Sequence, residues 1–128
     1  MGQFPVTPER ERILAKIPDY AVTIVPAGKR VTVKCKGHTI AKSDRALLVQ
    51  ETRHADLYYL PRSDVRLELF TSTDHSTYCP FKGNASYWTL NIEGAEEENV
   101  VWSYEDPYPE VEEIKDYMSF YTDRTEVS

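Results

Sequence analysis

Short segments in which apolar and polar residues alternate constrain the fold of this chain most. The stretch RVTVKCK, residues 30–36, places Val31, Val33 and Cys35 on one side and charged or hydroxyl-bearing residues on the other. Successive side chains of a β-strand point to opposite faces, so this period of two predicts a strand with one buried face. Further strand-like segments occur at residues 21–25, 38–43, 45–51, 56–60, 65–70, 86–92 and 99–104. The sequence therefore predicts a mainly β, antiparallel domain.

Two short helices are expected beside the strands. Residues 8–17, PERERILAKI, follow Thr7, which can cap a helix, and begin with Pro8, which suits the first helical position. Pro18 then ends the helix. A second helix is predicted over residues 109–118, where apolar side chains recur at helical spacing: Val111, Ile114, Tyr117 and Met118.

Charge and composition exclude several classes of protein. The chain has 128 residues, the size of one domain, and a net charge of −6. Its 15 Lys and Arg residues form no basic block, so we expect no nucleic-acid partner. No apolar run is long enough for a membrane span, and the first residues lack the apolar core of a secretion signal. Two cysteines make no disulfide framework, so a cytoplasmic protein with reduced thiols is expected.

The least ordinary stretch is TYCPFKGNASYW, residues 77–88. Pro80 favours an extended Cys79 at the end of a strand, and Gly83 is typical of a tight turn. If Phe81 packs inward, Lys82 is held on a short rigid loop and can meet a carboxylate or phosphate. The Cys79 thiol becomes a nucleophile if the nearby ammonium stabilises its thiolate. The alternative is a buried structural thiol and a solvated lysine.

A second cluster is ETRHADLYYLPRSD, residues 51–64, in which Glu51, Arg53 and His54 follow a predicted apolar strand. Glu51 could orient an amine or act as a base, and Arg53 could clamp an anion, although a surface salt bridge is the alternative. Tyr87 faces away from Trp88 in its strand, so part of the aromatic set is free to line a pocket near Lys82. No Cys-x-x-Cys or His-x-x-x-His pair and no glycine-rich phosphate loop occurs, so neither a metal nor a cofactor is predicted.

Three stretches together resemble a known family: ETRH with YYLP, CPFKGNASYW, and VWSYEDPYPEVEEIKDYMSFY. They are similar, in matching order over residues 29–125, to the small bacterial and fungal proteins of domain-of-unknown-function family 427, sometimes labelled nucleotidyltransferase-like. The resemblance implies a tent-like antiparallel β fold with flanking helices. It leaves residues 1–28 as an N-terminal arm outside the domain. It also implies a site made of Glu51, Tyr59, Cys79, Lys82, Gly83, Tyr87, Trp102 and Tyr121.

We therefore expect a pocket that binds, and could transform, a small polar and anionic metabolite. Lys82 and Arg53 would supply charge, and Glu51 would orient the ligand or transfer a proton. Lys82, Cys79 and Glu51 are the candidate catalytic residues. The ligand-binding candidates are Arg53, Tyr59, Gly83, Tyr87, Trp102 and Tyr121. The alternative function is a non-catalytic assembly module that forms a homo-oligomer through residues 8–17 or an exposed sheet edge.

Overall fold

Ten β-strands form three antiparallel sheets in the computed structural model, which describes residues 7–128. One sheet has the order β1-β4-β5, with β1 at Val22–Pro26, β4 at Leu47–Glu51 and β5 at Leu57–Tyr59. A second has the order β10-β2-β3, with β10 at Glu126–Val127, β2 at Val31–Cys35 and β3 at His38–Ser43. The third has four strands, β6 at Phe70–Cys79, β7 at Gly83–Ile92, β8 at Ala95–Ser103 and β9 at Met118–Phe120, in chain order. The predicted mainly β, antiparallel fold is confirmed.

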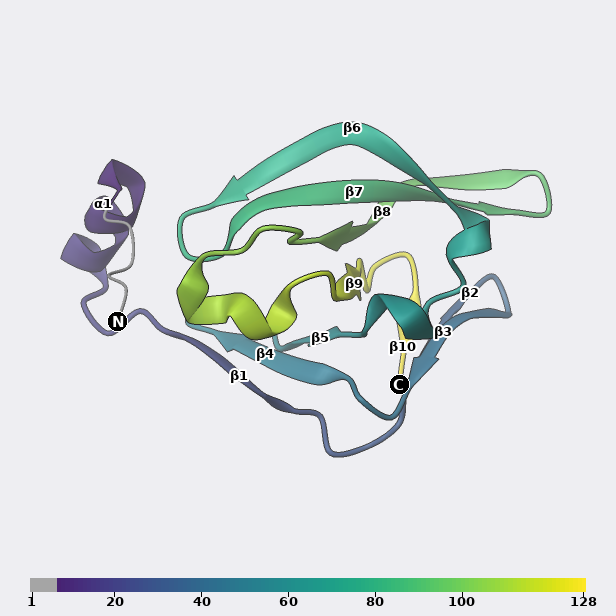
Figure 1. Ribbon diagram of the computed structural model, residues 1–128, viewed down its shortest axis with the longest axis horizontal. Helices are drawn as coiled ribbons and strands as arrows, with labels where there is room; N and C mark the ends of the chain where they lie inside the picture. The colour runs from purple at the N-terminus through teal and green to yellow at the C-terminus, as the bar shows by residue number, and fades with distance from the viewer. Residues whose placement is uncertain (1–6) are drawn as a thin grey trace.

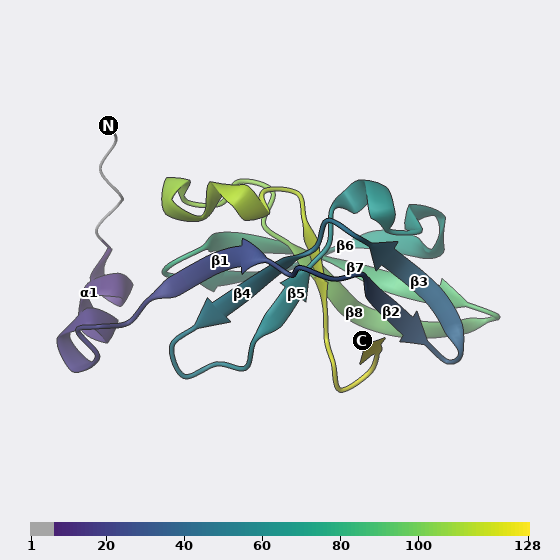
Figure 2. The same ribbon diagram turned by 90° about the horizontal axis from the view of Figure 1, so that it is seen from below.

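The four-stranded sheet arches over the other two (Figure 1), which lie beside one another when the molecule is seen from below (Figure 2). One backbone bridge ties the layers together, because the Leu60 and Met118 amides each donate to the other's carbonyl at 2.8 Å. This bridge brings the end of β5 against the start of β9. Side chains of strands from different sheets therefore meet in one interior.

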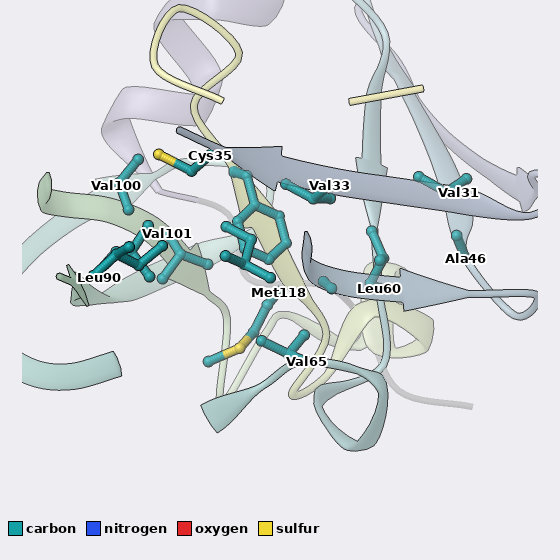
Figure 3. Packing of buried hydrophobic residues seen from close by; sticks show 14 residues of the cluster. Val31, Val33, Cys35, Ala46, Leu60, Val65, Leu90, Val100, Val101 and Met118 are labelled. Carbon is teal, nitrogen blue, oxygen red and sulfur yellow. The ribbon is translucent and has the colours of Figure 1, made fainter. Parts of the chain in front are cut away.

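The interior divides into two hydrophobic clusters. The aliphatic cluster, drawn in Figure 3, consists of Val31, Val33, Cys35, Ile40, Ala41, Ala46, Leu60, Val65, Leu90, Ile92, Val100, Val101, Met118 and Phe120. The aromatic cluster consists of Val49, Tyr59, Ala85, Tyr87, Trp102, Tyr104, Val111 and Ile114. Alternation along β2 explains the first cluster, since Val31, Val33 and Cys35 are buried while the residues between them are not.

Helix α1, Pro8–Lys16, begins as predicted, with the Thr7 hydroxyl accepting from the Arg10 amide at 3.1 Å. It lies at one end of the molecule, beyond β1 (Figure 1). Strand β1 pairs with β4 along its whole length, so residues 22–26 belong to a sheet. The N-terminal segment outside the sheets is therefore residues 7–21. Residues 1–6 of the predicted arm lie outside the described residues.

The second helix is shorter than predicted. Residues 109–118 were expected to be helical, but only Pro109–Ile114 form a 3-10 helix, η3. Asp116 takes a left-handed conformation with φ of 64°, and its amide donates to the Tyr104 carbonyl at 3.1 Å. Met118 is already committed to β9. The bridge to Leu60 thus ends the helix before its apolar spacing does.

Two strand predictions, at residues 65–70 and 99–104, were also wrong in detail. Residues 65–70 alternate like a strand, yet Leu67–Leu69 form a 3-10 helix, η2, and Leu67 is exposed. The chain turns at this point toward the four-stranded sheet. The strand that follows, β6, is rich in Ser and Thr and has no apolar alternation to reveal it. The acidic residues 96–98 lie within β8, since Glu93 and Gly94, both with positive φ, form the two-residue hairpin turn.

Candidate functional site

The Cys-Pro-Phe-Lys-Gly sequence forms the tight turn between β6 and β7. The Lys82 amide donates to the Cys79 carbonyl at 3.2 Å, and Pro80 occupies the second turn position. Gly83 has φ of +114°, and a Cβ there would lie 3.4 Å from the Asp106 carbonyl oxygen. Glycine is favoured there because L side chains rarely adopt this φ, and the backbone leading to η3 packs against it. Gly83 was expected to bind ligand, but its visible role is this close backbone contact, and it does not line the cavity described below.

Phe81 packs inward and is only 8% exposed. Its ring stacks on that of Tyr20, with centroids 4.5 Å apart. The Arg10 guanidinium lies 4.9 Å from the Phe81 centroid, and its Nε donates to the Pro80 carbonyl at 3.0 Å. Arg10 also pairs with Glu110 of η3. The N-terminal segment therefore holds the turn in place and fixes the starting point of the Lys82 side chain.

Lys82 and Glu51 form a buried ion pair, with side chains 8% and 10% exposed. The Lys82 Nζ donates to one carboxylate oxygen, and the Tyr20 hydroxyl donates to the other. Burial, followed by the hydrogen bond to Glu51, raises the pKa of Tyr20 well above its usual value. The phenol therefore keeps its proton and remains a donor. His54 is exposed, with its Nε2 3.7 Å from the Glu51 Oε2.

The ion pair opens onto a cavity of about 430 Å³, within the roughly 300–1,000 Å³ typical of ligand pockets. Aromatic side chains make up much of its wall: Tyr59, Tyr87, Trp102, Tyr104 and Tyr121. Hydrogen bonds fix these rings, since Trp102 Nε1 donates to the Tyr59 hydroxyl at 3.1 Å. The Tyr87 hydroxyl lies 2.9 Å from the Thr77 hydroxyl and 3.4 Å from that of Tyr121.

Three tyrosines of the wall, Tyr59, Tyr104 and Tyr121, carry no charge at neutral pH. Burial raises the pKa of Tyr59 and of Tyr104 far above the usual value. Burial and the hydrogen bond to Tyr87 raise the pKa of Tyr121 to about 12. The wall therefore offers flat apolar faces and neutral hydroxyl groups to a ligand, and its charges are concentrated at the Lys82–Glu51 pair.

The structure brings together most of the residues that the sequence singled out. Those lining the cavity are Glu51, Tyr59, Cys79, Lys82, Tyr87, Trp102 and Tyr121. Arg53 is not among them. Its φ of 65° belongs to the turn after β4, where the His54 amide donates to the Glu51 carbonyl at 3.0 Å, and its side chain is exposed. Of the two residues expected to supply charge, Lys82 lines the cavity and Arg53 does not.

Sequence reasoning missed Tyr20, which completes the hydrogen bonding of Glu51. The antiparallel pairing of residues 22–26 with 47–51 would have indicated it, because this pairing sets Val22 opposite Glu51 and places Tyr20 two residues before Val22. Tyr104 is not among the predicted site residues either, yet it packs in the aromatic cluster and lines the cavity, with its ring centroid 5.8 Å from the Lys82 Nζ.

The two cysteines differ. Cys79 is half-buried and lines the cavity, whereas Cys35 is 3% exposed inside the aliphatic cluster. Burial is the main reason that the pKa of Cys35 is raised. Within residues 7–128, no group of three or more His, Cys, Asp and Glu side chains could hold a metal ion. Of the predicted catalytic residues, Lys82 and Cys79 are the two candidate nucleophiles, and both line the cavity.

A family model described as a domain of unknown function, DUF427, matches residues 23–128. The chain belongs to the DUF427 family. The match extends beyond the residues 29–125 that carry the resemblance, and it includes β1 from Thr23 onward. A comparison with curated proteins finds no match. Across residues 7–128, no helix is long and apolar enough to cross a membrane.

The limits of the DUF427 match divide the site in two. The ion pair, Cys79 and the aromatic wall lie inside the matched residues, whereas Arg10 and Tyr20 precede residue 23. Most of the residues that line the cavity therefore lie within the matched residues, and the N-terminal segment adds Ile13 and Tyr20, whose phenol contacts Glu51.

Proposed function

We propose that the cavity binds a small polar molecule that presents a carboxylate or carbonyl oxygen to Lys82 and a flat or apolar part to the aromatic wall. The observation that carries the proposal is the buried Lys82–Glu51 pair at the edge of a ring-lined cavity. Burying two charges costs several kcal/mol of desolvation, and apolar residues in their place are often equally stable. Stability alone therefore does not explain why this ion pair is buried, whereas a ligand-binding role does.

The charge balance favours a ligand with an oxygen acceptor. Glu51 neutralises Lys82, and Arg53 lies outside the cavity wall. A ligand oxygen can replace one Glu51 oxygen at the Lys82 amine, because the Tyr20 hydroxyl still donates to the other oxygen. An anionic group or a polarised carbonyl therefore suits this end of the cavity best.

Assembly through residues 8–17 is the alternative function. It is supported less well, because Arg10 of α1 already contacts its own domain at the Pro80 carbonyl and at Glu110. Oligomerisation through the N-terminal segment would have to use other side chains of α1, since Arg10 is its one buried residue. A cytoplasmic location belongs to the proposal and is supported by the two free thiols.

The test is a thermal-shift screen of small carboxylates, aldehydes and ketones. A ligand at 100 times its Kd adds about 2.7 kcal/mol, which corresponds to roughly 10 °C for a domain of this size. We expect such a ligand to stabilise the wild type and Lys34→Met, which changes an exposed lysine of β2. It should not stabilise Lys82→Met. Because that variant leaves Glu51 without its cation, Lys82→Met/Glu51→Gln is measured beside it. Equal stabilisation of all four proteins would contradict the proposal.

A further inference from the structure

We infer that Lys82 is a carbonyl-reactive lysine, which forms a Schiff base with an aldehyde or ketone bound in the cavity. The inference rests on the proposed function, because it names the reaction of the same site and the chemical class of its ligand. Glu51 is the proton carrier of the reaction, and Tyr20 is a positioning residue for Glu51.

The first support is the contact between the amine and a base. An ammonium ion has no lone pair, so Lys82 must lose a proton before it can attack a carbonyl carbon. The Glu51 carboxylate is in direct contact with the Nζ and can accept that proton. Tyr20 donates to the second carboxylate oxygen, which leaves the first turned toward the amine.

The second support is the environment of the pair. Lys82 is 7% exposed, whereas every other lysine of the described chain is exposed. Its amine lies 5.8 Å from the Tyr104 ring, on a wall of uncharged aromatic side chains. A cavity of this kind excludes water when a ligand fills it, and the exclusion of water slows hydrolysis of an imine. Lys36 also contacts a carboxylate, that of Glu97 at 3.2 Å, but its side chain is 49% exposed to solvent.

The reaction is balanced with the groups present. Lys82 passes a proton to Glu51, and its nitrogen lone pair attacks the carbonyl carbon while the C=O π electrons move to oxygen. That oxygen takes the proton from Glu51, and the nitrogen returns a second proton to the carboxylate, which gives a neutral carbinolamine. Glu51 then protonates the hydroxyl group, which leaves as water as the nitrogen lone pair forms the C=N bond. The products are a protonated imine, one water molecule and the Glu51 carboxylate, so the ion pair is restored.

The aromatic wall sets the preferred carbonyl compound. Tyr87, Trp102 and Tyr121 present aromatic rings, to which the two tyrosines add hydroxyl groups, and the ring centroids of Trp102 and Tyr121 lie 4.7 Å apart. A flat aromatic aldehyde can stack on these rings, whereas a small aliphatic keto acid gains only the contact with Lys82. The aromatic aldehyde should therefore react faster.

The experiment traps the imine by reduction. The protein is incubated near neutral pH with 4-hydroxybenzaldehyde or pyruvate and sodium cyanoborohydride, and adducts are located by peptide mass spectrometry. We expect one adduct, on Lys82, to form at least tenfold faster than adducts on exposed lysines such as Lys34, and faster with the aldehyde. Lys82→Arg keeps the cation beside Glu51 and should lose the adduct. Glu51→Gln should slow labelling of Lys82 at least tenfold. Tyr20→Phe should shift the pH dependence of the labelling rate.

Each outcome decides between the two proposals, since the thermal shift given by each probe is recorded on the same samples. Adducts spread over the exposed lysines, with Lys82 reacting last, would overturn the Schiff-base inference and leave a structural ion pair. A Lys82-dependent thermal shift without an adduct would overturn it too, but would preserve the binding function. If no carbonyl or carboxylate compound gives either a shift or an adduct, both proposals fail.

Discussion

The two hydrophobic clusters of this domain differ in composition and in what they enclose. The aliphatic cluster is built from Val, Ile, Leu, Ala and Met with one thiol and one phenyl ring, and most of its members are entirely buried. The aromatic cluster holds three tyrosines and a tryptophan, and it lies against the cavity that contains Lys82. One domain thus combines a core closed by aliphatic packing with a second core whose polar groups face a ligand-sized space.

The difference follows from the side chains. Aliphatic groups have no hydrogen bonds to lose, so they can be buried completely and contribute the full hydrophobic free energy. A buried tyrosine must place its hydroxyl group against a partner, as Tyr59 does against Trp102. The hydrogen-bonded polar atoms therefore lie along the surface of the aromatic cluster, and apolar side chains alone cannot pack against them. We therefore expect the aliphatic cluster to determine stability and the aromatic cluster to determine binding.

The largest expected effect is on stability. Leu60→Ala removes an entirely buried side chain of the aliphatic cluster and should lower the free energy of unfolding by about 3 kcal/mol. Leu57→Ala changes the same residue type at the other end of the β5 region, where Leu57 is half-buried at the cavity wall, and should cost about 1 kcal/mol. Urea denaturation measures both. Equal losses would show that the clusters contribute alike.

Alkaline pH should act on the aromatic cluster. The unfolded chain loses tyrosine protons near pH 10, whereas burial keeps Tyr59 and Tyr104 protonated in the folded protein. The unfolded state then binds fewer protons, so the free energy of unfolding falls as the pH rises above this value, by about 1.4 kcal/mol per pH unit for each such group.

Tyr104→Phe isolates one of these groups. The variant should show a slope shallower than the wild type by about 1.4 kcal/mol per pH unit above pH 10. Urea denaturation at several pH values gives the slope, and tyrosinate absorbance confirms which state has titrated. Parallel slopes for the two proteins would mean that Tyr104 titrates when folded, and the cluster would be open to water.

The sequence predicted the strands whose two faces differ. In RVTVKCK the alternation is complete, and β2 was found where expected. The Ser- and Thr-rich strand β6 was missed because its side chains are largely exposed and its identity depends on pairing with β7. The second helix was predicted to be too long, because apolar residues at helical spacing continue to Met118. The Met118 backbone is instead hydrogen-bonded to Leu60 in the bridge between the sheets. Tertiary hydrogen bonds overrode the local pattern in both regions.

The site could be predicted in part for the same reason. Glu51 and Lys82 lie 31 residues apart, but each stands where a predicted strand meets a turn, so their proximity could be expected. The position of Tyr20 depends on strand register, which alternation does not specify. Arg53 was assigned from its side-chain chemistry, and a left-handed backbone in the turn directs it elsewhere.

Tyr20→Phe sharpens the comparison at the edge of the aromatic cluster. It keeps the ring that stacks on Phe81 and removes the hydroxyl group that donates to Glu51, so the free energy of unfolding should fall by about 1 kcal/mol. Tyr58→Phe, at a half-buried ring packed against the aliphatic cluster, is the matched control and should change stability less. A cavity ligand should bind Tyr20→Phe more weakly than it binds Tyr58→Phe. Equal affinity of the two variants would show that the Tyr20 hydroxyl group of the N-terminal segment does not contribute to ligand binding.

The smallest perturbation is alkylation of a thiol, which reports how often each cluster opens. Cys79 lines the cavity and should react with iodoacetamide in the folded protein, whereas Cys35 should react only after the aliphatic cluster opens. Because such opening is rare in a stable core, Cys79 should be labelled at least about a hundredfold faster. Peptide mass spectrometry gives both rates, and Cys79→Ala isolates the slow one. A cavity ligand should slow the labelling of Cys79 selectively. If both thiols react at one rate, a single opening exposes both clusters, and the aromatic cluster is no more accessible than the aliphatic one.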